Sequence, residues 1–327
     1  MALVPNPLSP NPLRIVFFGT PEFAVPTLTK LIDAPDIEIS GIVTQPDARR
    51  GRGNQLLPPP VKATALERGL ICPIWQPERL KKDALVLNAL AALTADVFVV
   101  VAYGQILSQK ILDLPRYGCI NVHGSLLPQY RGAAPIQWSI ANGETVTGIT
   151  TMQMDAGIDT GAMLLKDSLE ITPADNSETL SAKLAVIGGD LLLQTLRDLP
   201  QITPIPQDDT AANYAPMITK EQFILDWQQS AQHLNQQIRA FYPNCYTIYQ
   251  GQRLKVLASI PESITPDDDA PHGTVTAIRK GSGFVVKTGS GNLVITTVQP
   301  AGKKVQSGWD FANGARLQLG SLLSCHE

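Results

Sequence analysis

Cysteine is scarce in this sequence. Four cysteines are spread over 327 residues, with no CxxC pair and no cluster of cysteines and histidines. Such spacing indicates neither a disulfide framework nor a zinc site, so we expect no bound metal. It favours a reducing compartment and therefore a cytoplasmic protein. The positions are Cys72, Cys119, Cys245 and Cys325.

Long apolar runs and a dominant charge are missing as well. No stretch approaches the ~20 apolar residues that a membrane-spanning helix needs, so we expect no membrane contact. Residues 1–12 lack the basic start and apolar run of a signal peptide, and we interpret them as a flexible tail. The net charge is −3, from 26 basic and 29 acidic residues. Any nucleic-acid-binding surface must therefore be a local patch.

The sequence does contain the pattern of an α/β domain. Residues 13–18 and 37–43 are apolar runs, and Thr20-Pro21-Glu22 between them is typical of a helix start with Thr20 as its cap. A strand, a helix and a strand in this order predict a mostly parallel, Rossmann-like sheet. The turn after the first run lacks G-x-G-x-x-G, which argues against a nicotinamide-dependent dehydrogenase.

A second domain is expected after a stretch rich in proline and threonine. Five short apolar segments lie between residues 245 and 298, separated by glycine-containing turns. Their number and spacing predict a small all-β barrel of the oligonucleotide-binding (OB-like) type. We therefore divide the chain into the tail at 1–12, an α/β domain at 13–200, a linker at 201–216 and the barrel domain at 217–327.

Polar side chains gather at the end of one predicted strand, residues 118–122. Asn121 and His123 are two positions apart, so they share one face of the strand. Asp159 lies in a glycine-flanked loop after the next strand, from which it could fold back toward His123. An amide, an imidazole and a carboxylate suit acyl transfer to an amine. The amide stabilises an oxyanion, the imidazole moves a proton, and the carboxylate fixes the imidazole tautomer.

Three motifs around these residues resemble those of the 10-formyltetrahydrofolate-dependent formyltransferases. They are N-V-H-G-S-L-L-P at 121–128, R-G-A-A-P-I-Q-W at 131–138 and M-D-A-G-I-D-T-G at 154–161. The resemblance covers almost the whole chain and implies that Asn121, His123 and Asp159 are the catalytic residues of the domain at 13–200. It also implies a folate site that comprises Ser125, Leu126, Leu127, Pro128, Tyr103 and Gly104.

The wider match is to the members of this family that act on methionyl initiator tRNA. It implies that a monomer transfers the formyl group of 10-formyltetrahydrofolate to the amino group of the charged tRNA, for translation initiation. Residues 44–62 form a long basic segment, and the resemblance implies that this loop meets the acceptor arm. The expected tRNA contacts are Arg49, Arg50, Arg52 and Lys62 in the loop, and Arg253, Lys255, Lys303 and Lys304 on the barrel.

Other interpretations stay open on the sequence alone. His123 could be an ordinary core histidine, and the cations could be scattered solvated charges. A formyltransferase that acts on a purine precursor or an amino sugar, or a formyl-folate hydrolase, would share the three catalytic residues and the folate loop. Such an enzyme would need neither the basic loop nor the barrel. A non-catalytic RNA-binding protein would leave Asn121, His123 and Asp159 unexplained.

Overall fold

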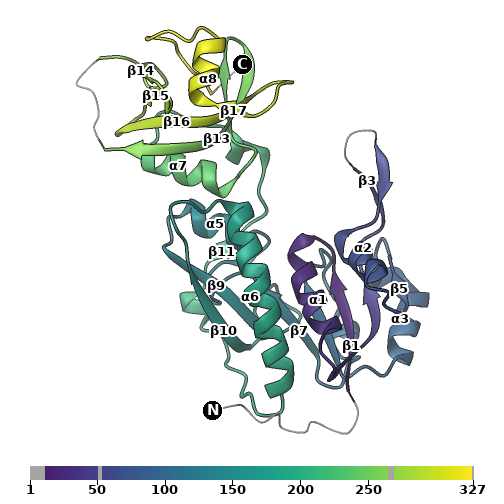
Figure 1. Ribbon diagram of the computed structural model, residues 1–327. Coiled ribbons are helices and arrows are strands. Elements are labelled where there is room, and N and C mark those ends of the chain that lie inside the picture. Colours follow the sequence, from purple (N-terminus) through teal and green to yellow (C-terminus); the bar gives the residue numbers. More distant parts are fainter. Residues whose placement is uncertain (1–11, 51–53, 264–268, 326–327) are drawn as a thin grey trace. The chain divides into compact units, whose positions relative to one another are not determined.

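The structure is a computed structural model that describes residues 12–50, 54–263 and 269–325 (Figure 1). The chain divides into two compact units. Unit 1 comprises residues 1–132, 147–169 and 181–214, and unit 2 comprises residues 133–146, 170–180 and 215–327. Because the units interleave along the chain, the contiguous boundaries at 13–200 and 217–327 remain a proposal. Nearly all of the expected tail at 1–12 lies outside the described residues.

Unit 1 is built on a seven-stranded sheet in the order β10-β9-β7-β6-β1-β2-β5. Strand β1 pairs in parallel with β2 and β6, β6 with β7, and β2 with β5, whereas β9 runs antiparallel to β7. The predicted mostly parallel sheet is confirmed. Its strands are β1 (Leu13–Gly19), β2 (Ile37–Val43), β5 (Ile74–Trp75), β6 (Val97–Val101), β7 (Cys119–His123), β9 (Val146–Gln153) and β10 (Met163–Glu170).

The first helix begins differently from the expectation. A 3-10 turn, η1 (Glu22–Ala24), precedes α1 (Val25–Ile32), and no side chain of the described residues caps either element. Thr20 Oγ1 instead donates a hydrogen bond of 3.0 Å to the carbonyl of Tyr103, so it ties the end of β1 to the end of β6. The other helices along this part of the chain are α2 (Pro60–Glu67), η2 (Leu80–Lys82), α3 (Ala84–Ala92), α4 (Gln109–Leu112) and α6 (Ser177–Asp198).

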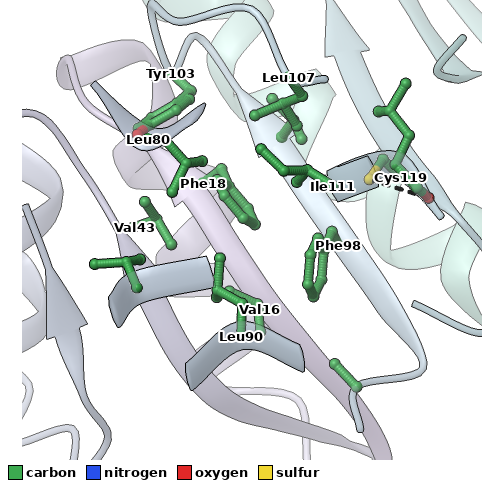
Figure 2. Close-up of a cluster of buried hydrophobic side chains, with 14 residues drawn as sticks. Val16, Phe18, Val43, Leu80, Leu90, Phe98, Tyr103, Leu107, Ile111 and Cys119 are labelled. Carbon is green, nitrogen blue, oxygen red and sulfur yellow. Dashed lines mark hydrogen bonds between the residues drawn. The ribbon is translucent and has the colours of Figure 1, made fainter. Parts of the chain in front are cut away.

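A hydrophobic cluster covers one face of the central strands (Figure 2). Phe18 packs on Phe98 and on Tyr103, with ring centroids 5.2 Å and 5.5 Å apart. Burial raises the pKa of the Tyr103 phenol. Large aromatic side chains bury much apolar area, so this cluster holds β1 against β6 and the residues that follow it. Functional groups of parallel sheets gather at such strand ends.

Two short strand pairs form sheets of their own. In the basic segment, where we expected a loop, β3 (Ala48–Arg50) and β4 (Gln55–Leu57) form an antiparallel strand pair. The second pair joins β8 (Arg131–Gly132) to β11 (Tyr214–Ala215), with the 3-10 turn η3 (Asp209–Ala211) just before β11. This second pair brings residues of the predicted linker against the segment that follows β7.

Unit 2 contains an antiparallel sheet in the order β12-β13-β16-β15-β14, with β17 paired to β16. The five predicted strands are present, whereas β17 and the following helix were not expected. The strands are β12 (Tyr246–Tyr249), β13 (Gln252–Glu262), β14 (Val275–Arg279), β15 (Gly283–Lys287), β16 (Asn292–Pro300) and β17 (Gln306–Ser307). The helical elements of this unit are α5 (Pro135–Ala141), η4 (Lys220–Phe223), α7 (Ala231–Ala240) and α8 (Gly308–Gly314).

The C-terminal residues join the two ends of this sheet. The backbone of Ile248, on the edge strand β12, exchanges two hydrogen bonds with Ser324, of 2.8 Å and 3.0 Å. On the opposite edge, Leu322 forms a bridge with Thr274, next to β14. Closing a sheet satisfies the edge strands, as expected of a small β-barrel. Among the described residues of the whole chain, no helix is long and apolar enough to cross a membrane.

Candidate active site

The end of β7 carries two buried polar side chains on one face. Asn121 is 9% exposed and His123 is 5% exposed, although every other residue of this strand is apolar. Strand alternation places the two side chains on the same side. Burying a polar group without a partner costs free energy, so both side chains need hydrogen-bonding neighbours. These neighbours come from the loop that holds Asp159 and from the segment after β7.

Asp159 reaches these side chains because its loop folds tightly between β9 and β10. Asp159 itself has a left-handed backbone, with φ of 55°. The loop closes where the Gln153 amide donates to the Ala162 carbonyl at 2.8 Å. Gly161 permits this turn, because a Cβ there would lie 1.8 Å from the Gln153 carbonyl oxygen. The predicted approach of Asp159 to His123 is therefore present in the structure.

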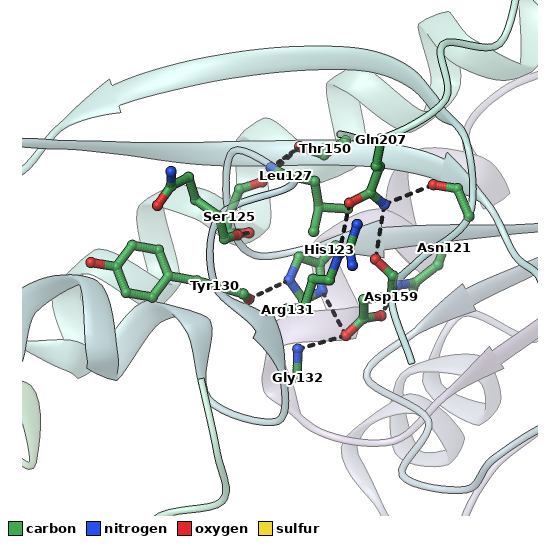
Figure 3. A network of polar contacts seen from close by, with 12 residues as sticks. Asn121, His123, Ser125, Leu127, Tyr130, Arg131, Gly132, Thr150, Asp159 and Gln207 are labelled. Carbon is green, nitrogen blue, oxygen red and sulfur yellow. Dashed lines mark hydrogen bonds and ion pairs between the residues drawn. The ribbon is translucent and has the colours of Figure 1, made fainter. Parts of the chain in front are cut away.

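The Asp159 carboxylate has three polar neighbours (Figure 3). Its Oδ2 accepts a 2.9 Å hydrogen bond from the amide of Gly132, and its Oδ1 lies 3.5 Å from the Asn121 Nδ2. Its Oδ2 also lies 3.6 Å from the His123 Nδ1, with both side chains mostly buried. A separation of 3.6 Å is too long for a hydrogen bond, but the two groups would form an ion pair if His123 were protonated.

The other ring nitrogen decides the histidine tautomer. His123 Nε2 lies 2.9 Å from the carbonyl oxygen of Tyr130. Because a carbonyl can only accept, Nε2 carries the proton in the neutral ring, and Nδ1 presents a lone pair to Asp159. This differs from the expectation that Asp159 fixes the tautomer, since the Tyr130 carbonyl takes that part. Nδ1 is therefore the ring nitrogen that can accept a proton, and the carboxylate beside it would stabilise the charge gained there.

The six residues expected to bind folate differ in accessibility. Ser125, Leu127 and Tyr103 are buried, whereas Leu126 and Pro128 are half-buried and Gly104 is exposed. Ser125 Oγ donates to the carbonyl of Gln129 at 2.6 Å. The buried members therefore offer little surface to a ligand in this conformation, whereas Leu126, Pro128 and Gly104 offer exposed surface. Their part in folate binding stays a prediction.

Two of the cations in the basic segment make contacts with neighbouring residues. Lys62 Nζ contacts both carboxylate oxygens of Asp47, at 2.9 Å and 2.8 Å, and Gln76 Oε1 at 2.7 Å. Hydrogen bonds from Gln76 and from Lys62 lower the pKa of the Asp47 carboxyl. Arg49 Nη1 donates to the Asn54 carbonyl across the hairpin at 3.0 Å. The side chain of Arg50 and all of Arg52 lie outside the described residues.

In unit 2 two of the predicted cations line a groove of about 720 Å³, which we call the cationic groove. The guanidinium of Arg253 lies over the ring of Tyr246, 4.6 Å from its centroid. Lys255 and Lys220 lie in the same groove, together with Glu221. Lys303 lines an adjoining groove of about 350 Å³, and Lys304 is exposed. Their role in tRNA binding stays a prediction.

Three residues of this neighbourhood were missed by sequence reasoning. Arg131 is only 2% exposed, and its Nε donates to Gln207 Oε1 at 2.9 Å while its Nη2 pairs with Asp209 at 2.8 Å. Asn213 accepts a hydrogen bond from the backbone amide of Tyr130. Gln207 and Asn213 belong to the stretch that its composition marked as a linker. Nothing in the sequence pattern signals contacts of such long range.

Comparison with known proteins shows the family to which the chain belongs. The formyl transferase family matches residues 13–196, and the C-terminal domain of formyl transferases matches residues 217–316. The chain therefore belongs to the formyl transferase family, which confirms the resemblance seen in its motifs.

Individual relatives show which formyl transferases this chain resembles in sequence. A methionyl-tRNA formyltransferase of Trichormus variabilis is 55% identical over 332 residues, which covers 95% of this chain and 99% of the relative. One of Thermosynechococcus vestitus is 56% identical over 322 residues, with 94% and 97% coverage. Among solved structures, the N-formyltransferase of Helicobacter canadensis with folinic acid and dTDP-3-aminofucose has a TM-score of 0.64 at 16% identity. That match covers 88% of this chain and 99% of the neighbour, and it supports the fold alone.

Proposed function

We propose that this protein transfers the formyl group of 10-formyltetrahydrofolate to the amino group of methionyl initiator tRNA. The observation that carries the chemistry is the His123 ring, whose Nδ1 lone pair faces Asp159 while Nε2 is engaged by the Tyr130 carbonyl. Relatives above 50% identity that span nearly the whole chain are named methionyl-tRNA formyltransferases. That similarity supports the choice of acceptor.

The first step forms a bond between the methionyl amine and the formyl carbon. The amine nitrogen attacks, and the electron pair of the formyl C=O moves onto its oxygen. Asn121 Nδ2 has two protons, one of which points toward Asp159 Oδ1 at 3.5 Å, so the second is available to the oxyanion. Preorganised donors of this kind stabilise developing charge in a water-poor site. Asn121 is thus the proposed oxyanion donor.

Proton transfer accompanies this step. His123 Nδ1 takes the proton of the attacking amine, and the imidazolium then lies beside the carboxylate of Asp159. When the tetrahedral intermediate collapses, the carbonyl re-forms and the bond from carbon to the folate N10 breaks. N10 receives the proton held by His123, through water. Formylmethionyl-tRNA and tetrahydrofolate result, and the catalytic residues return to their starting state.

The folate donor is proposed to contact the surface of Leu126, Pro128 and Gly104. These residues follow β7 and β6, two neighbouring strands of the parallel sheet. Ligands of open α/β sheets bind outside the carboxyl ends of such strands. The strand-end carbonyl of Tyr103 is held by Thr20 and by Gln45 Nε2, at 3.0 Å and 3.1 Å. This leaves the Gly104 backbone as an exposed and firmly positioned edge for the ligand.

The charged tRNA is proposed to contact Arg49, Arg50, Arg52 and Lys62 in unit 1, and Arg253, Lys255, Lys303 and Lys304 in unit 2. Phosphate contacts by basic side chains supply most of the affinity for nucleic acid. We further propose that the protein acts as a monomer in the cytoplasm, where charged tRNA is used. Sedimentation equilibrium measures the oligomeric state directly, and a stable dimer would contradict this part.

Transfer of labelled formyl from 10-formyltetrahydrofolate to methionyl initiator tRNA, beside a matched elongator tRNA, tests the function. We expect transfer to the initiator alone. Deletion of the β3–β4 hairpin is expected to remove activity on charged tRNA. Absence of transfer by folded protein, with transfer to a nucleotide or amino-sugar acceptor, would replace the proposed acceptor. Salt-sensitive RNA binding without any formyl transfer would contradict an enzymatic role altogether.

A further inference from the structure

We propose that Gln207 and Asn213 are positioning residues for formyl transfer, because one short segment of unit 1 holds the partners of both His123 and Asp159. We call residues 207–213 the strap. Composition marks it only as part of a linker, yet it makes hydrogen bonds to two separate parts of the site. This inference rests on the proposed function for its chemistry, but its geometry does not depend on which amine accepts the formyl group.

The N-terminal end of the strap holds the Asp159 loop. Gln207 Nε2 donates to the carbonyls of Asp159 and Gly161, at 2.8 Å and 2.7 Å. Since Asp159 has a positive φ of 55°, its backbone conformation is sparsely populated and depends on such contacts. Gln207 therefore fixes the residue that carries the carboxylate, without touching the carboxylate itself (Figure 3).

The orientation of the Gln207 amide is determined by its neighbours. Two carbonyl groups face its Nε2, and these can only accept. Its Oε1 receives a 2.9 Å hydrogen bond from Arg131 Nε, which can only donate. Arg131 is 2% exposed and also pairs with Asp209 of the strap at 2.8 Å. A buried charge that is hydrogen-bonded on several sides keeps the strap in one arrangement.

The C-terminal end of the strap holds the group that selects the His123 tautomer. Asn213 Oδ1 accepts the backbone amide proton of Tyr130, and the carbonyl of Asn213 accepts that of Arg131 at 3.0 Å. Tyr130 is also left-handed, with φ of 57°. Its own carbonyl then meets His123 Nε2 at 2.9 Å. Asn213 thus acts on the histidine through one intervening residue.

The consequence of losing the contact between Asn213 and Tyr130 follows from what lies opposite each ring nitrogen of His123. With Tyr130 in place, Nε2 carries the proton and Nδ1 is the free base. Without the carbonyl, the nearest acceptor for a ring proton is the Asp159 carboxylate, 3.6 Å from Nδ1. The proton would then sit on Nδ1, and Nδ1 could no longer accept one from the substrate amine. The proposed base would then be lost.

Asn213 offers a matched pair of variants. Asn213→Asp keeps an oxygen that can accept the Tyr130 amide, whereas Asn213→Leu has a similar volume and no acceptor. Asp208→Ala is the control, because Asp208 lies in the strap but its side chain hydrogen-bonds, among the residues that the structure describes, to Thr210 alone, at 2.9 Å and 2.7 Å. We expect Asn213→Leu to lower kcat about 10-fold or more, since a general base contributes about 10²–10⁴-fold. The KM values for folate and tRNA should stay within about 2-fold of wild type. Asn213→Asp and Asp208→Ala should behave as wild type.

The decisive measurement is the tautomer of His123, read from long-range proton–nitrogen spectra of 15N-labelled protein at alkaline pH. The chain has four histidines, and the His123→Gln variant identifies the signal. We expect the Nε2-protonated tautomer in wild type and Asn213→Asp, and the Nδ1-protonated tautomer in Asn213→Leu. An Nδ1-protonated wild type would overturn the inference even if no variant folds. So would a folded Asn213→Leu with unchanged kcat or an unchanged tautomer. Wild-type protein with the expected tautomer but no formyl transfer would instead refute the proposed function.

The Gln207 end has its own test. Gln207→Met removes both donors at similar size, and we expect kcat to fall about 10-fold, with both KM values unchanged. If Gln207 acts through Asp159, this loss should vanish in an Asp159→Asn background, because the loop then carries no charge to position. Equal losses in both backgrounds would overturn the role of Gln207, since they would indicate a general structural effect.

Discussion

The proposed catalytic group of unit 1 and the cationic groove of unit 2 are both polar, but they are built in opposite ways. Asn121 and His123 are at most 9% exposed, and hydrogen bonds hold their neighbours in single orientations. Arg253, Lys255 and Lys220 instead line an open groove of about 720 Å³, where long side chains reach solvent. Buried polar groups depend strongly on each neighbour, whereas exposed charges act nearly additively. The two regions should therefore respond very differently to substitution.

The largest expected effect is the loss of the buried proton acceptor or its counterion. His123→Ala or Asp159→Ala should lower kcat by about 100-fold or more, the usual scale for a positioned acid–base group. Single-turnover kinetics with saturating folate and tRNA would measure it, and a thermal melt would establish that each variant is folded. A stable His123→Ala variant with near-wild-type turnover would remove the basis of the mechanism.

Substitution in the cationic groove should change binding and not chemistry. Removing both cations in Arg253→Ala/Lys255→Ala should raise the KM for tRNA several-fold and leave kcat unchanged. If each side chain contacts one phosphate, the slope of log affinity against log salt should become shallower by about 2. Binding measured between low and physiological salt tests this. Lys280→Ala is the control, because Lys280 is exposed in the same unit and lies outside the groove.

An unchanged salt slope in the double variant would show that the groove does not bind phosphates. A fall in kcat with an unchanged KM would be equally informative, because it would mean that this region affects the reacting groups. Either result would break the contrast between a region that reacts and a region that binds.

The sequence predicted most of what depends on short-range patterns. The strands β1 and β6 were predicted because their apolar runs are buried on both faces. Asn121 and His123 were placed together because the strand period of two is unambiguous. Thr20 was misinterpreted as a helix cap, since a threonine before proline suits a cap as well as the long-range hydrogen bond that it makes.

The contacts that hold Tyr130 and His123 in place could not be predicted from such patterns. Asn213 and Tyr130 are 83 residues apart, and their contact joins a side chain to a backbone amide. A side chain that binds backbone places no constraint on the residue type of its partner, so no complementary pair appears in the sequence. The tautomer of His123 likewise depends on a backbone group, the carbonyl of Tyr130. The sequence does not reveal that contact, so it pointed only to Asp159.

A smaller effect is expected where a predicted tRNA contact is already engaged. Asp47→Asn would remove the ion pair with Lys62, which keeps its contact with Gln76, and would remove a negative charge from the basic segment. It should therefore lower the KM for tRNA a few-fold at low salt. Because the contacts of Gln76 and Lys62 lower the pKa of Asp47, its carboxylate stays charged at and above the ordinary range. The contact is lost only as the pH falls through that lowered pKa. Tighter binding at neutral pH in the variant would be the supporting result, and weaker binding would show that Lys62 acts by anchoring the segment.

The smallest effect is expected from the exposed ion pair between Glu262 and Arg279 on the barrel. Arg279 Nη2 lies 2.9 Å from Glu262 Oε2, and the two side chains are 45% and 31% exposed. Such pairs contribute at most about 1 kcal/mol, so Arg279→Ala should change the free energy of unfolding by less than that.

The hydrogen bond from Arg279 lowers the pKa of Glu262, so the contribution is present above the ordinary glutamate range and disappears as the pH falls through the lowered value. Urea unfolding at neutral and acidic pH should therefore show a small difference between wild type and variant that vanishes in acid. Because Glu262 already engages Arg279, the salt slope for tRNA should not change, and a slope that did change would extend the phosphate-binding surface beyond the groove.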